Sequence, residues 1–188
     1  MKLLTISLLT ISLLAASEAE APKKMSAKME GVKYIKMMGK ELKTNVKKHM
    51  MADKSGLEAA NFCAKEASGL AKKINEKLPE YAKVRRTSMK LRNKDNAADA
   101  LDIKVMKEYM ASMEAKTFTK KDVKVVADGD TTRVYVPVVV GDVCLKCHGE
   151  NISADISKAI KAKFPDDKAT GFKKGDLRGV MVAEIKKH

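Results

Sequence analysis

Residues 141–150 read GDVCLKCHGE, and this stretch constrains the chain more than any other. The sequence of 188 residues contains only three cysteines and three histidines, yet Cys144, Cys147 and His148 stand almost side by side. Simple counting gives a random C-x-x-C-H in a chain of this composition on the order of one time in a thousand. The spacing therefore needs a chemical explanation rather than a statistical one.

The C-x-x-C-H pattern suits covalent attachment of a haem. Two thiols on one turn of backbone can form thioethers with the two vinyl groups, and the adjacent imidazole then points at the iron. Two other uses of such cysteines are known. A dithiol redox pair normally opens a helix in a βαβ unit, and a structural zinc site needs further ligands; neither context is visible here. The motif predicts one haem c, held through Cys144 and Cys147, with His148 on the iron.

The N-terminal stretch MKLLTISLLTISLLAASEAEAPKK has the form of a secretory signal peptide. Lys2 supplies a basic start, residues 3–16 are apolar, and small residues follow. Because Pro22 disfavours cleavage just before it, we expect a signal peptide over residues 1–19 and a single mature domain over residues 20–188. An uncleaved anchor is the alternative. No later segment is apolar for long enough to cross a bilayer, so the sequence predicts a soluble protein that is periplasmic or otherwise exported. Bacteria attach haem c on the exported side of the membrane.

The charge of the chain limits its partners. Lys and Arg number 38 against 24 Asp and Glu, a formal net charge of +14, and the lysines are spread along the whole chain. A solvated basic surface is the simplest interpretation, and an acidic partner protein or an anionic membrane surface is the functional one. Aromatic residues make up only 4% and Trp is absent, which leaves little to stack on bases and disfavours nucleic-acid binding.

The first half of the chain has helical periodicity. Apolar residues recur at helical spacing over residues 25–51, which predicts a long amphipathic helix. After a break at ADKSG, Ser55 and Glu58 have the form of a capping box, and a second helix is expected to run to about Leu78. Its inward stripe is rich in alanine, which lets another helix or a flat ligand approach closely. Cys63 lies at the edge of that stripe.

The second half changes to the period of strands and predicts an α+β layout with an antiparallel sheet. A tight turn is expected at Asp128 and Gly129. The expected elements are an extended piece at 81–86, a helix at 97–115, strands at 123–127 and 132–140, a short helix at 153–163 and a last strand at 179–186.

Several residues compete for the iron position opposite His148. The methionines of the first helix have gap-filling as their ordinary role, His49 lies near the end of that helix's apolar stripe, and His188 is the last residue. Cys63 is the remaining candidate. A single Cys on an apolar helix face is most often a small core residue, but export and the odd cysteine count favour a bound thiolate.

Three blocks of the sequence resemble a family of exported single-haem c-type domains with a PAS-like fold, found as free-standing bacterial proteins and as input domains of sensor histidine kinases. The blocks are NFCAKEASGL at 61–70, RRTSMKLRNKDNAADAL at 85–101, and CLKCHG at 144–149 with the later ATGFKKGDLRG at 169–179. The second block is the most specific, because ordinary cytochromes c lack it.

The resemblance implies a PAS-like sheet with N-terminal helices packed on it, and it implies roles for individual residues. His148 and Cys63 correspond to the two axial ligands. Arg86 and Arg92 then become candidates for binding the haem propionates, since guanidinium suits carboxylates. One departure is Lys94, where the family often has Pro, and this change should affect the loop more than the haem.

Three functions are compatible with these expectations. A His/thiolate site leaves no open position on the iron, so a redox or small-gas sensor would act by losing the Cys63 ligand and would need a separate signalling partner. A small electron-transfer cytochrome that docks an acidic partner is the alternative. A haem peroxidase-type enzyme is disfavoured, because no distal acid–base pair is evident; no catalytic residue is therefore predicted.

Overall fold

The computed structural model describes residues 25–186. The signal peptide expected at residues 1–19 lies outside the described residues, as does His188. In chain order the elements are helices α1 (Ala27–Ala52), α2 (Leu57–Lys65) and α3 (Ala67–Asn75), strand β1 (Ala82–Thr87), the 3-10 turn η1 (Lys94–Asn96), helix α4 (Ala100–Glu114), strands β2 (Lys124–Asp128) and β3 (Thr131–Val139), helices α5 (Asp142–His148) and α6 (Ala154–Lys163), and strand β4 (Leu177–Lys186).

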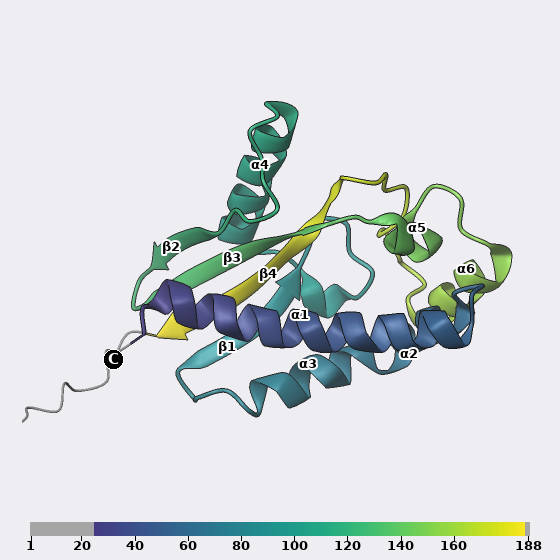
Figure 1. Ribbon diagram of the computed structural model, residues 1–188, viewed down its shortest axis with the longest axis horizontal. Coiled ribbons are helices and arrows are strands. Elements are labelled where there is room, and N and C mark those ends of the chain that lie inside the picture. The colour runs from purple at the N-terminus through teal and green to yellow at the C-terminus, as the bar shows by residue number, and fades with distance from the viewer. Residues whose placement is uncertain (1–24, 187–188) are drawn as a thin grey trace, which may run out of the picture.

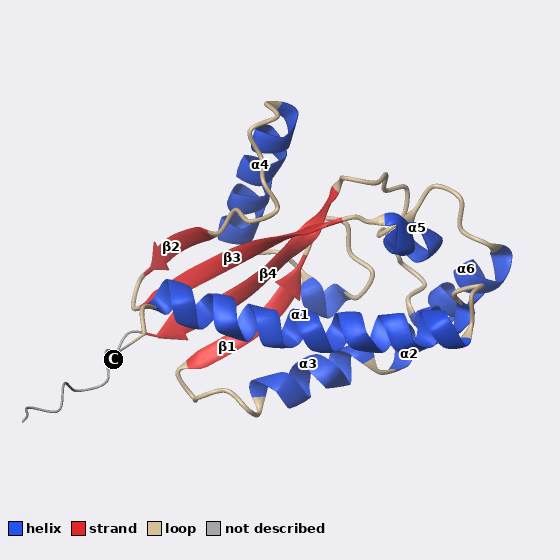
Figure 2. Ribbon diagram, viewed as in Figure 1, coloured by secondary structure: helices blue, strands red, loops and turns tan. Residues whose placement is uncertain are grey.

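Four antiparallel strands form one sheet in the order β1-β4-β3-β2. Figure 1 shows α1 lying along this sheet and α4 projecting from it, and Figure 2 separates the helices from the strands by colour. Alternation along the strands divides the two faces: Val134 and Ala183 pack with α1, whereas Tyr135 and Val182 pack with α4. The expected α+β, PAS-like fold with N-terminal helices on an antiparallel sheet is confirmed.

Helix α1 lies close against the sheet because of a glycine. A Cβ atom at Gly31 would lie 2.6 Å from Cγ2 of Val134 on β3, so only glycine allows this approach. The helix begins at Ser26, whose hydroxyl accepts a hydrogen bond from the Met29 amide. Its buried face then consists of Gly31, Tyr34, Ile35, Met38 and Leu42. The long helix predicted over residues 25–51 is confirmed.

The capping box predicted before α2 is wrong. The carboxylate of Asp53, not the hydroxyl of Ser55, accepts the hydrogen bond from the Glu58 amide at 3.1 Å, and Ser55 donates its own hydroxyl to that carboxylate at 2.6 Å. These bonds, with the Ser55 hydroxyl first, lower the pKa of Asp53 to about 2. An ionised carboxylate is the stronger acceptor, and Gly56 at φ +93° turns the chain so that Asp53 can reach the helix start.

The single helix predicted from residue 57 to about Leu78 is also wrong. The chain breaks at Glu66 into α2 and α3, and α3 ends at Asn75. The break has a tertiary reason, because it lets α2 contact α6 while α3 contacts β1. At the end of α3, the Asn75 side chain donates to the Val84 carbonyl at 2.8 Å and accepts from the Val84 amide at 2.7 Å. The amide group thereby closes the edge strand β1, as a neighbouring strand would.

Helix α4 begins later than predicted. A start near residue 97 is expected from the sequence, but Asp99 is the cap and forms a capping box with Asp102. Asp102 is completely buried and accepts hydrogen bonds from Arg85 at 2.8 and 3.0 Å and from the Tyr135 hydroxyl at 3.1 Å. This network attaches α4 to the sheet. The four predicted strand regions and the turn at Gly129 are confirmed. No helix within residues 25–186 is long and apolar enough to span a membrane.

Candidate functional site

Helix α5 places the two cysteines of the C-x-x-C-H motif on one helical turn. The helix starts shortly after β3 and ends at His148, and the amide of the next residue, Gly149, donates to the Leu145 carbonyl at 2.9 Å. A Cβ atom at Gly149 would lie 2.5 Å from the Leu145 oxygen, so this tight helix end requires glycine. Figure 1 shows α5 and α6 beyond the end of the sheet, next to the turn between α1 and α2.

The imidazole of His148 is held in one tautomer. Its Nδ1 lies 2.7 Å from the carbonyl oxygen of Ala169, and because a carbonyl only accepts, Nδ1 must carry the proton. Phe172 packs edge-on against the imidazole, with the two ring centroids 6.3 Å apart. Burial first, and then the positive charges of Arg92 and Arg178, lower the pKa of His148 to about 3. The ring is therefore neutral at physiological pH, with Nε2 free as a metal ligand.

Cys63 on α2 lies near the C-x-x-C-H motif, although 81 positions separate it from Cys144 (144 − 63). One turn before it, Ala60 is buried in a cluster with Cys147, Ile156 and Ile160. Burial raises the pKa of Cys147 and the neighbouring Cys63 raises it further, so the two thiols share one electrostatic environment. Burial also raises the pKa of the Cys63 thiol. The alanine expected to permit close approach therefore faces the motif.

Three arginines and one buried carboxylate lie around Cys63 and the C-x-x-C-H motif. Arg92 forms an ion pair with Asp167 at 3.0 Å. The side chain of Arg86, on β1, makes no hydrogen bond or ion pair within residues 25–186, and burial lowers its pKa. Arg178 of β4 donates to Ser88, and burial, Arg92 and Arg86 together lower its pKa to about 10. A guanidinium that neighbouring cations destabilise, as Arg92 and Arg86 destabilise Arg178, is a ready site for an anion.

The structure thus brings together the sequence-predicted residues Cys63, Arg86, Arg92 and the C-x-x-C-H motif. Sequence reasoning missed two residues, Arg178 and Asp167. Arg178 lies inside the block ATGFKKGDLRG, so the block pointed to it, but nothing in its spacing indicated that β4 would carry it to the site.

The other ligand candidates lie in ordinary packing positions. His49 stacks on Phe62 with ring centroids 4.9 Å apart, one residue before Cys63. Among the methionines of α1, Met38 is fully buried in the core, whereas Met29 is exposed. These contacts place His49 beside the helix that carries Cys63, and they assign the buried methionine to packing.

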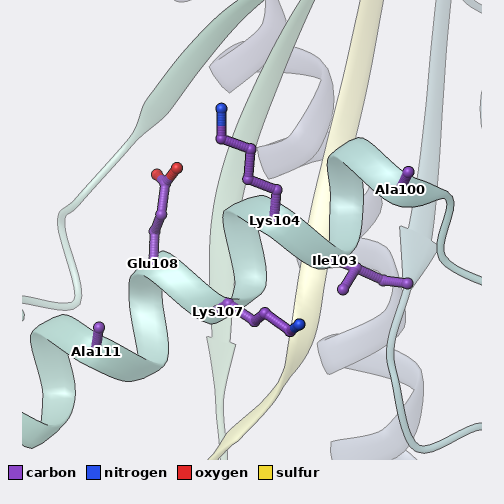
Figure 3. A pocket seen from close by; sticks show the side chains of 6 residues that line it. All are labelled: Ala100, Ile103, Lys104, Lys107, Glu108 and Ala111. Carbon is purple, nitrogen blue, oxygen red and sulfur yellow. The ribbon is translucent and has the colours of Figure 1, made fainter.

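A shallow hollow elsewhere on the molecule is not part of this site. Its lining carries no cysteine or histidine, and Glu108 within it is paired with Lys124 at 2.7 Å. Figure 3 shows that it follows one face of α4, lined by Ala100, Ile103, Lys104, Lys107, Glu108 and Ala111.

Comparison with known proteins supplies the family. A family model described as Tll0287-like matches residues 14–185. A solved structure described as "Crystal structure of the cyanobacterial heme-protein Tll0287" matches with a TM-score of 0.53 and 26% sequence identity, over 65% of this chain and 70% of that chain. A search of curated proteins found no match.

Proposed function

The chain belongs to the Tll0287-like family, and on that premise we propose that it is an exported c-type haem protein. Cys144 and Cys147 hold the haem covalently, and His148 ligates the iron. The observation that carries the proposal is the hydrogen bond from His148 Nδ1 to the Ala169 carbonyl, which directs Nε2 to a metal. The haem protein of known structure supports the same cofactor.

The residues around the motif fit a haem. Ala60 packs against Cys147, so α2, which carries Cys63, meets the motif through a small side chain. The two propionates would bring two negative charges to a region where Arg86 has no partner among the described residues and Arg178 is destabilised by other arginines. Arg92 is already bound to Asp167, so we assign the propionates to Arg86 and Arg178 first. When bound, the haem supplies a one-electron redox centre.

Cys63 is the proposed sixth ligand, and its release is the proposed signal. A thiolate favours ferric iron, so with haem bound, reduction would weaken the bond to Cys63 and would free α2. The ring stack between Phe62 and His49 then links α2 to the end of α1. Because α1 contacts three strands of the sheet, a shift of α2 reaches the rest of the fold through it. The protein would thus act as a redox or small-gas sensor with a separate signalling partner.

The first test is the visible absorption and EPR spectrum of the exported protein beside Cys63→Ala and Cys63→Ser. Covalent haem with low-spin thiolate signals that disappear in both variants supports the His148/Cys63 pair. His49→Ala is the matched control, since it removes the neighbouring candidate ligand and should leave the spectrum unchanged. Spectra unaltered by loss of Cys63 would return this residue to the core and point to His49 or a methionine.

Gas binding tests the sensing mechanism separately. The proposal requires that CO and NO bind only the reduced protein, because only then would Cys63 leave the iron. A ferrous protein that stays six-coordinate and refuses both gases contradicts it.

The net charge of +14 favours a second candidate, a small electron carrier that docks an acidic partner. In that case electron exchange should be fast and strongly dependent on salt, with no change of ligand on reduction. Stopped-flow reduction by an anionic donor at several ionic strengths separates the two functions. Neither the description of the family nor that of the matching haem protein names an enzymatic activity.

A further inference from the structure

A buried ion pair lies directly behind the C-x-x-C-H motif. Arg92 donates from Nε and Nη2 to Oδ2 of Asp167 at 3.2 and 3.0 Å. The side chains are only 9% and 5% exposed. One residue earlier, Asp166 pairs with Lys94 at 2.7 Å on the surface, with both side chains more than half exposed. Adjacent carboxylates therefore make one exposed pair of little energetic consequence and one buried pair.

The buried pair holds Ala169, the residue whose carbonyl accepts the hydrogen bond from His148. Oδ1 of Asp167 accepts the Ala169 amide at 2.9 Å, and the carbonyl of the same Ala169 accepts His148 Nδ1 at 2.7 Å. Arg92 Nη2 also donates to the Cys147 carbonyl at 2.5 Å. One carboxylate and one guanidinium thus bridge the loop around Ala169 to the end of α5.

We propose that Asp167 and Arg92 are positioning residues that orient His148 and lower the reduction potential of the iron it binds. This inference rests on the proposed function. A carbonyl bond to Nδ1 makes the imidazole a stronger donor, which favours the ferric state. The Asp167 carboxylate keeps that carbonyl in place and also neutralises Arg92, whose charge would otherwise favour the ferrous state. Both effects act in the same direction.

The experiment compares Asp167→Asn with Asp166→Asn in the haem-loaded protein. Each variant removes one formal negative charge, from neighbouring positions, so the change in net charge is the same in both. Redox titration of Asp167→Asn should increase the ferrous-to-ferric ratio at fixed potential about tenfold, which is about 59 mV for one electron. Asp166→Asn should change it less than about twofold, since its charge is exposed and screened. Equal shifts in the two variants, or a downward shift for Asp167→Asn, overturn the proposal.

Arg92→Lys distinguishes the positioning effect of the Arg92 guanidinium from the effect of its charge. It also tests the proposal if Asp167→Asn fails to fold. Lysine keeps the positive charge but lacks the planar fork that joins Asp167 to the Cys147 carbonyl. Altered EPR g-values and a raised potential support positioning, whereas wild-type values overturn it.

Failure of the proposed function has a different signature. If the wild-type protein carries no covalent haem, that function fails, and nitrogen NMR of His148 then tests the positioning role. A single Nδ1–H tautomer that becomes mixed in Asp167→Asn supports it, and an unaltered tautomer overturns it.

Discussion

Gly179 is the position where the structure predicts the largest effect from one added methyl group. It lies in β4 at φ +157°, and a Cβ atom there would lie 2.3 Å from the Thr87 carbonyl oxygen and 3.0 Å from Cβ of Ser88. Ser88 accepts a hydrogen bond from Arg178 and donates to the Arg178 carbonyl. Gly179→Ala therefore separates β1 from β4 where both lead into the candidate site.

The expected magnitude has two parts. The backbone conformation costs a non-glycine residue about 1–3 kcal/mol, and relieving the overlap with backbone and Ser88 costs about 1–3 kcal/mol more. A total of about 4 kcal/mol is a large share of the roughly 5–15 kcal/mol that stabilises a typical domain. For a chain of this size it corresponds to a fall in Tm of roughly 8–16 °C.

Gly175→Ala is the matched control. Gly175 has φ +98°, and nothing lies within 4 Å of its added Cβ, so only the conformational cost of about 1–2 kcal/mol applies. Thermal unfolding followed by circular dichroism compares the two variants. If the two variants have the same Tm, the close approach of Gly179 to Thr87 adds nothing to the cost of an alanine at position 179, and the prediction is refuted.

Three further predictions concern stability and titration. Asp102→Ala leaves Arg85 and the Tyr135 hydroxyl without their buried partner, so the free energy of unfolding in urea should fall by about 3–5 kcal/mol. Asn75→Ala leaves the amide and carbonyl of Val84 unpaired and should cost about 2–3 kcal/mol in the same assay. Burial raises the pKa of Tyr109 to about 12 from the ordinary value near 10. Its neutral phenol therefore contributes stability that is complete below about pH 10 and is lost as the pH rises through about 12, which urea unfolding across that range measures.

Each of these has a control in the chain. Glu108→Ala removes an exposed carboxylate paired with Lys124 and should cost less than about 1 kcal/mol. Asn45→Ala removes an asparagine whose side chain makes only exposed hydrogen bonds within α1 and should also cost less than about 1 kcal/mol. Tyr109→Phe should lessen the alkaline loss of stability. If Asp102→Ala or Asn75→Ala loses no more free energy of unfolding than its control, the role given to that side chain is wrong. If the free energy of unfolding falls as steeply with rising pH in Tyr109→Phe as in the wild type, Tyr109 is not the group responsible.

Local patterns carried the predictions that the structure confirms. The long α1, the strand pairs around Gly129 and the last strand follow from periodicity and turn residues, which act over a few positions. The errors arise where neighbours in space decide. Asp53 instead of Ser55 accepts the hydrogen bond from the Glu58 amide because Gly56 turns the chain. The helix predicted through Glu66 breaks because α2 and α3 pack against different partners.

By itself, the sequence determined which segment carries the candidate chemistry, since Cys144, Cys147 and His148 are adjacent in the chain and their spacing is a local property. The odd number of cysteines, together with the position of Cys63 beside an alanine-rich helical stripe, also indicated Cys63. The tertiary structure alone shows that Arg178 of β4 lies beside Arg86 and Arg92, and that Asp167 binds the amide of Ala169, whose carbonyl meets His148. These residues come from elements far apart in the sequence, and their meeting depends on the antiparallel pairing of β1 with β4 and on the loop that leads into β4. No local pattern encodes that pairing, because it is set by the packing of the whole sheet.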